Sequence, residues 1–176
     1  MISFMVLAGP RSATTWMANL LTTDTTLCMH DPSLEHRIQT LDQIGVPGKR
    51  LGIADTSALL WPDWLEKHPA KKVVLWRDPA EINTALRALG MRELDRVGHS
   101  NRIGATLHWK NVRIYSWASV FQWKYAKSMC DFLGVPVDEW RYRELVKMNI
   151  QPQFQRLPLG KEAVQELVRR LAEELK

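Results

Sequence analysis

Short continuous apolar runs alternate with amphipathic or polar segments along this chain. The runs have the composition of buried strands, and they predict strands at residues 2–8, 51–55, 72–76 and 112–115. Strand-like and helix-like segments that alternate in this way predict an α/β fold. We therefore expect three layers, with helices covering both faces of a mainly parallel central sheet.

Helices are expected between and after these runs. Proline opens several of them, at a position where its missing N–H has no helical partner, and Gly134 follows a helix that it would terminate. Thr14 is a candidate N-cap for the first helix. The predicted helices cover residues 14–22, 32–43, 57–67, 79–89, 118–132 and 138–148.

The C-terminal part holds a clear amphipathic pattern. An irregular connection at 149–160 leads to a predicted helix from about residue 161, whose apolar face would carry Val164, Leu167, Val168, Leu171 and Leu175. Residues 91–110 are polar and basic without a clear period, so no element is predicted there.

The length of 176 residues indicates one domain, residues 1–176. No apolar run approaches the roughly 18 to 20 residues that a membrane span needs. The chain does not open with a basic segment and a small-residue cleavage site. We therefore expect a soluble, cytoplasmic protein with no membrane partner.

Composition narrows the kinds of ligand. The chain has 24 Lys and Arg against 19 Asp and Glu, for a net charge of +5. These charges are spread along the chain, so we expect an anionic small ligand and not a nucleic acid. Cys28 and Cys130 lack metal-type spacing, and no other set of His, Cys, Asp and Glu has it, so reduced thiols and no metal site are expected.

The segment after the first predicted strand carries the most specific chemistry. Residues 9–15 read Gly-Pro-Arg-Ser-Ala-Thr-Thr, and a helix follows. A loop between a strand and a helix can aim several backbone N–H groups at one anion, and the helix N-terminus adds about half a positive charge. Arg11 adds a permanent charge, and Thr14 and Thr15 add hydroxyl donors. The segment predicts a phosphate or sulfate site.

This loop differs from the Walker A pattern G-x-x-x-x-G-K-[ST]. Ala13 stands where a glycine would help, and no lysine follows. The difference disfavours an ATP or GTP hydrolase, while a P-loop-type kinase or phosphotransferase stays open as an alternative.

Two segments resemble the sulfotransferases that use 3'-phosphoadenosine 5'-phosphosulfate (PAPS). Residues 11–16, Arg-Ser-Ala-Thr-Thr-Trp, resemble the family's 5'-phosphosulfate loop, usually written R-S-G-T-T and an apolar residue. Residues 73–82 resemble its 3'-phosphate motif, a strand followed by R-[DN]-P and a helix, here Arg77-Asp78-Pro79. The Phe-Leu-Gly-Val-Pro segment at 132–136 is similar to a third piece found in many relatives.

The resemblance implies a P-loop NTPase-like fold and PAPS as donor substrate. The acceptor would be a hydroxyl or an amine on a small molecule or peptide. A family serine that binds the 3'-phosphate falls at Ala85 here, and Thr84 and Asn83 are the candidates to replace it. The donor-binding residues implied are Pro10, Arg11, Ser12, Ala13, Thr14, Thr15, Trp16, Arg77 and Thr84.

Sulfuryl transfer needs a group that stabilises charge on the leaving oxygen and a base that takes the acceptor proton. Arg11 is the candidate for the first role. The resemblance places the base shortly after the first helix, where His30 and Asp31 lie. A histidine titrates near neutrality, and Asp31 could act directly or orient His30. A structural alternative is that Asp31 caps the helix opened by Pro32.

The function class and the acceptor pocket stay open. Because Ala13 and Ala85 replace family residues, a non-catalytic nucleotide-binding protein with this fold is a third interpretation. The scattered His68, His99 and His108 are not expected to be ligands. An aromatic acceptor pocket could draw on Trp16, Trp61, Trp64, Trp109 and Trp117.

Overall fold

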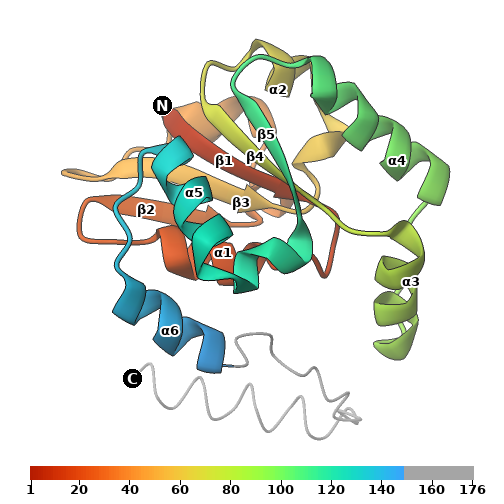
Figure 1. Ribbon diagram of the computed structural model, residues 1–176. Coiled ribbons are helices and arrows are strands. Elements are labelled where there is room, and N and C mark those ends of the chain that lie inside the picture. The colour runs from red at the N-terminus through yellow and green to blue at the C-terminus, as the bar shows by residue number, and fades with distance from the viewer. Residues whose placement is uncertain (149–176) are drawn as a thin grey trace, which may run out of the picture.

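The computed structural model describes residues 1–148, so the connection and helix expected beyond residue 148 lie outside the described residues. A five-stranded sheet with the order β2-β3-β1-β4-β5 forms its centre, and every strand pair in it is parallel (Figure 1). The strands are β1 (Ile2–Ala8), β2 (Thr26–His30), β3 (Arg50–Asp55), β4 (Lys71–Trp76) and β5 (Val112–Ser116).

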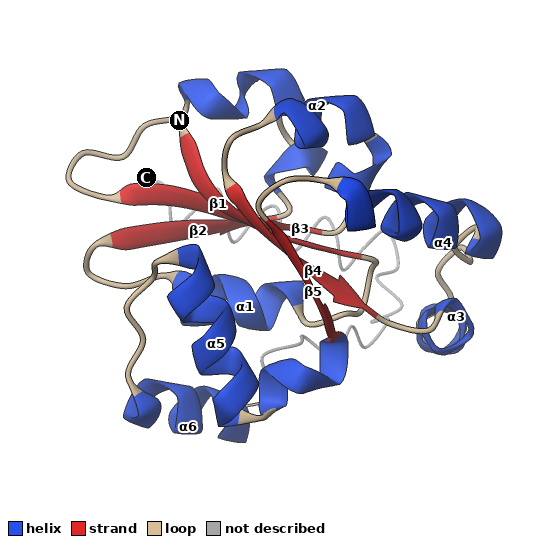
Figure 2. Ribbon diagram, turned by 45° about the horizontal axis from the view of Figure 1, so that its top comes forward, coloured by secondary structure: helices blue, strands red, loops and turns tan. Residues whose placement is uncertain are grey.

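Helices cover both faces of this sheet, as the sequence predicts. Figure 2 shows α1, α5 and α6 on one side of the sheet and α2 and α4 on the other. The α/β class and its layers are therefore confirmed. The helices are α1 (Thr14–Leu21), α2 (Pro62–Lys67), α3 (Pro79–Ala88), α4 (Arg96–Ala105), α5 (Trp123–Leu133) and α6 (Glu139–Lys147).

The central strand β1 separates two hydrophobic cores. Phe4 and Val6 face the core under α1 and α5, whereas Met5 and Leu7 face the core on the α2 and α4 side. This alternation follows from the two-residue period of a strand. A strand with both faces covered is apolar throughout, which explains the continuous run at residues 2–8.

Two elements were not predicted. β2 lies at the edge of the sheet, where its alternate residues are only partly buried, and so its sequence lacks a continuous apolar run. α4 falls in the polar segment 91–110 and buries only two residues, His99 and Ile103. An apolar stripe that narrow does not stand out as a helical period.

Three predicted helices were too long. Extended backbone at Arg37 leaves two short 3₁₀ helices (Pro32–Leu34 and Ile38–Gln43) in place of one helix at 32–43. Before α2, Trp61 is non-helical because it precedes a proline, and a 3₁₀ turn (Ala58–Leu60) comes first. Extended backbone at Gln122 likewise separates a 3₁₀ helix (Trp117–Phe121) from α5.

All five strands are parallel, so their carboxyl ends lie along the same end of the sheet. The chain leaves β1 through α1 toward β2, and it reaches β4 on the other side of β1. Ligands of open α/β sheets bind in the crevice where the connections diverge in this way. The segments after β1 and β4 therefore hold the position where a ligand is expected. None of the described helices is both long and apolar enough to cross a bilayer.

Candidate functional site

The β1–α1 loop has the backbone conformation of an anion cradle. Arg11 (φ 62°) and Ala13 (φ 66°) both adopt the left-handed conformation, and Ser12 between them is buried. Turns that include left-handed residues form concavities lined by backbone N–H groups. The left-handed residue at Ala13 also gives a physical reason for the glycine that the resembling motif carries at this position.

The start of α1 corrects one prediction. Ala13, and not Thr14, is the N-cap, and no side chain caps the first turn. The first backbone N–H groups of α1 therefore lack a side-chain acceptor, as an anion-binding helix end requires. Thr14 and Thr15 instead place their Oγ1 atoms 3.2 Å and 3.0 Å from His30 Nε2.

His30 and Asp31 stand at the carboxyl end of β2, next to the threonines. His30 Nε2 lies 3.3 Å from Asp31 Oδ2, while Asp31 Oδ1 accepts a 2.6 Å hydrogen bond from Thr56 N. Asp31 holds the N-cap position of the short helix after it, but its side chain makes no capping bond. The prediction that the Asp31 side chain caps the helix opened by Pro32 is therefore wrong. Burial raises the pKa of Asp31, and the Thr56 N–H opposes that rise.

A fully buried carboxylate holds the segments that carry Asp31. Asp55 Oδ1 accepts hydrogen bonds from Ser33 Oγ at 2.7 Å and Ala58 N at 2.7 Å. Its Oδ2 accepts from Ser33 N at 3.0 Å. Because Ser33 follows β2 and Ala58 follows β3, Asp55 ties the ends of two neighbouring strands together. Its role in the described structure is to fix this corner.

Arg77 links the two segments that the sequence singles out. Its Nη1 donates to the carbonyl oxygen of Arg11, so the end of β4 meets the β1–α1 loop. Its Nε donates to Glu81 Oε2 at 3.2 Å, and its guanidinium lies 4.1 Å from the centre of the Trp117 ring. Trp117 follows β5 as Arg77 follows β4. The sequence named Trp117 only as a candidate for an acceptor pocket, and its contact with Arg77 was not predicted.

A cavity of about 460 Å³ continues from Arg77 along α3. Thr84 lines it, and its hydroxyl donates to the Ala80 carbonyl at 2.9 Å. Asn83 is buried and holds Leu94 N at 2.7 Å through its side-chain oxygen, so it is not a substitute for the missing serine. The cavity is lined by Arg77, Ala80, Glu81, Thr84, Ala85 and Ala88.

Arg11 and Trp16, two of the predicted donor-binding residues, are surrounded in different ways. The Nε atom of Arg11 is buried and has no hydrogen-bond partner among the described residues. Trp16 is a core residue whose indole Nε1 donates to the Leu145 carbonyl at 3.2 Å. What Trp16 can offer a ligand is thus its backbone N–H in the first turn of α1.

The five tryptophans do not form one aromatic pocket. Trp16 and Trp117 pack in the core on the α1 side, whereas Trp61, Trp64 and Trp109 pack in the core on the other face. The sheet separates the two sets. Within residues 1–148, no three His, Cys, Asp or Glu side chains gather as metal ligands would.

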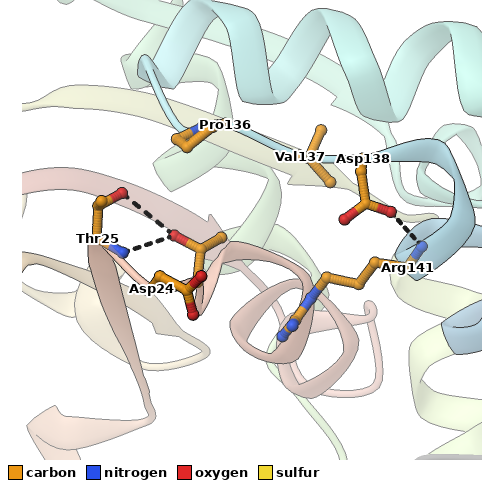
Figure 3. A pocket seen from close by; sticks show the side chains of 7 residues that line it. Asp24, Thr25, Pro136, Val137, Asp138 and Arg141 are labelled. Atoms are coloured by element: carbon orange, nitrogen blue, oxygen red, sulfur yellow. Dashed lines mark hydrogen bonds between the residues drawn. The ribbon is translucent and has the colours of Figure 1, made fainter.

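A second cavity, of about 410 Å³, lies where β2 begins, beside the segment between α5 and α6 (Figure 3). Its lining residues come before β2 and after α5 in the chain, so it lies away from the carboxyl ends of the strands. Arg141 at its wall already donates Nη2 to two carbonyl oxygens, those of Asn19 and Thr22. Its lining residues are Thr23, Asp24, Thr25, Pro136, Val137, Asp138 and Arg141.

The parallel sheet and its helical layers have the fold of the sulfotransferases. Mouse sulfotransferase SULT7A1, solved in complex with PAP, is similar with a TM-score of 0.58 and 13% identity, over 83% of this chain and 63% of that one. The chain thus spans less than two thirds of the mouse protein. The sulfotransferase domain from the curacin biosynthetic pathway has a TM-score of 0.50 and 12% identity, over 93% of this chain and 82% of that domain.

Similarity at these identities is a similarity of fold. Neither a protein-family model nor a curated protein sequence matches the chain.

Proposed function

We propose that this protein is a sulfotransferase-like enzyme that moves a sulfuryl group from PAPS to a hydroxyl or amine acceptor. The hydrogen bond from Arg77 to the Arg11 carbonyl carries the proposal, since it joins the two phosphate-type segments at one crevice. PAP, the product that PAPS leaves behind, occupies the similar mouse sulfotransferase, which supports the same nucleotide here.

The 5'-phosphosulfate group of the donor is assigned to the β1–α1 loop. The uncapped first turn of α1, the guanidinium of Arg11 and the hydroxyls of Thr14 and Thr15 supply donors from one side. The hydroxyl of each threonine has one proton, which it can donate either to His30 Nε2 or to an anion in the loop. The loop also contributes Pro10, Ser12, Ala13 and the backbone of Trp16.

The 3'-phosphate is assigned to Arg77 and the adjoining cavity along α3, where Thr84 lies. Arg77 now pairs with Glu81, whose side chain is 57% exposed. An exposed pair of this kind contributes at most about 1 kcal/mol, and a bidentate bond from arginine to phosphate is stronger. A phosphate can therefore displace Glu81, while stacking on Trp117 keeps the guanidinium in place.

The catalytic assignment follows the positions of the polar side chains. The acceptor atom forms a bond to sulfur, the bond from sulfur to the phosphate oxygen breaks, and the acceptor loses its proton. Arg11 stabilises the charge that develops on the leaving phosphate oxygen. His30 and Asp31 take the proton as a pair, because the buried Asp31 carboxylate lies beside His30 Nε2.

Calorimetry with adenosine 3',5'-bisphosphate tests the donor assignment. Binding without any divalent cation is expected, because Arg11 and Arg77 offset part of the phosphate charge and backbone N–H groups donate hydrogen bonds to the phosphate oxygens. ATP with Mg²⁺ is the comparison. Tighter, magnesium-dependent binding of ATP would show a phosphotransferase, and no heat with the bisphosphate at millimolar concentration would overturn the proposal.

A further inference from the structure

A buried histidine lies against the first residue of the anion loop. His99 belongs to α4 and is 3% exposed. A Cβ atom added to Gly9 would lie 2.8 Å from His99 Cε1 and 2.9 Å from His99 Nε2. The edge of the imidazole that carries Nε2 therefore packs directly on the backbone where β1 ends and the loop begins.

This nitrogen lacks a partner. His99 Nε2 is buried and makes no hydrogen bond to any described residue. A buried polar atom without a partner costs roughly 1–3 kcal/mol, so it points to a missing group. Arg11 Nε, two residues beyond Gly9, is buried and unpaired in the same way. One unsatisfied nitrogen thus belongs to the loop, and the other lies against the loop's first residue.

We propose that His99 is a further ligand of the anion held by the β1–α1 loop, to which it donates Nε2–H. The anion approaches from the crevice, α1 supplies its free N–H groups from one layer, and α4 supplies His99 from the other. The inference rests on the proposed sulfate or phosphate site, and it requires no particular nucleotide.

The charges around His99 determine how the anion acts on it. Burial lowers the pKa of His99, and the neighbouring Arg102 on α4 lowers it further. Asp95, at the start of α4, is occupied by the Gly98 N–H. From α3, the apolar Ile82 shares the contact with Gly9. An anion in the loop supplies the negative charge that favours imidazolium, so its binding takes up a proton.

Nuclear magnetic resonance of the histidine rings tests the inference on the intact chain, with inorganic sulfate as the probe. Sulfate does not titrate between pH 5 and 8. Saturating sulfate is expected to raise the pKa of His99 by about one unit, which makes sulfate binding about tenfold tighter when His99 is protonated. His99→Gln keeps an N–H donor but cannot be protonated, so this pH dependence should disappear. The exposed His108→Gln is the matched control and should retain it.

The outcomes separate this inference from the proposed function. If sulfate shifts the Thr14 and Thr15 amide signals and leaves the pKa of His99 unchanged, the His99 assignment is wrong and the anion loop stands. If the pKa of His99 responds to sulfate but adenosine bisphosphate does not bind, the assignment stands and the nucleotide proposal fails. If neither anion acts on loop or histidine, both fail. The measurement on the unmodified chain decides even where His99→Gln does not fold.

Discussion

At the scale of single residues, the site depends on backbone conformations that its side chains tolerate poorly. Arg11 and Ala13 both have positive φ angles, and neither is glycine. A non-glycine residue in this region costs roughly 1–2 kcal/mol. Such strain persists where the surrounding structure enforces it, and it is common at ligand sites. The buried position of Ala13 at the N-cap of α1 enforces it here.

Relief of this strain should stabilise the protein. Ala13→Gly is expected to raise the free energy of unfolding by about 1 kcal/mol, because glycine adopts φ 66° freely, although it also gains entropy in the unfolded chain. Urea denaturation measures the change. Alanine to glycine at Ala88, in the last turn of α3, should instead destabilise by about 1 kcal/mol. A loss of stability in Ala13→Gly would show that the strain is smaller than the cost of removing the buried methyl group of Ala13.

Substitution of Arg77 gives the most specific prediction for nucleotide affinity. Arg77→Ala should weaken adenosine 3',5'-bisphosphate by about 2–4 kcal/mol, because a charged hydrogen-bonding partner of a phosphate is lost. Arg77→Lys should recover only part of this, since lysine cannot form the paired bonds. Calorimetry measures both. Arg143→Ala, which removes an exposed arginine on α6, is the control and should leave the affinity unchanged. Equal affinities for Arg77→Ala and wild type would remove Arg77 from the site.

At the scale of elements, the sequence was informative where burial is two-sided. Apolar runs predicted β1, β3, β4 and β5, and the same runs placed the Arg11 and Arg77 segments at the carboxyl ends of strands. The edge strand β2 could not be predicted this way. His30 was therefore a candidate only by position along the chain, and its contact with Thr14 and Thr15 depends on strand order, which local pattern does not encode.

At Gly52, the ring of a β1 residue occupies the space that a β3 side chain would need. A Cβ atom at Gly52 in β3 would lie 2.0 Å from the Phe4 ring of β1. Gly52→Ala should therefore destabilise the protein by about 1–3 kcal/mol through overpacking of this central strand pair. Gly45→Ala is the control, because nothing lies within 4 Å of a Cβ there. Thermal unfolding compares the two, and equal midpoints would mean that Phe4 moves aside at no cost.

At the scale of the whole molecule, buried ionisable groups predict a maximum of stability near pH 9. Lys72 is fully buried and donates Nζ to the carbonyl oxygens of His68 and Ala70, and burial lowers its pKa from 10.5 to about 8. Between pH 8 and 10.5 the unfolded chain holds more protons at this group than the folded chain. Stability therefore rises as the pH increases through this window, by about 1.4 kcal/mol per pH unit at most.

The two buried thiols act in the opposite direction. Burial raises the pKa of Cys130 to about 12 and raises that of Cys28 further, while both ionise near 9.0 when unfolded. Above pH 9 the unfolded chain therefore holds fewer protons at these thiols, and stability falls. Since two thiols outweigh one lysine, urea denaturation should show stability rising from pH 8 to 9 and falling above it. Lys72→Met should abolish the rise and keep the fall; a rise that survives this substitution would show that Lys72 is not its source.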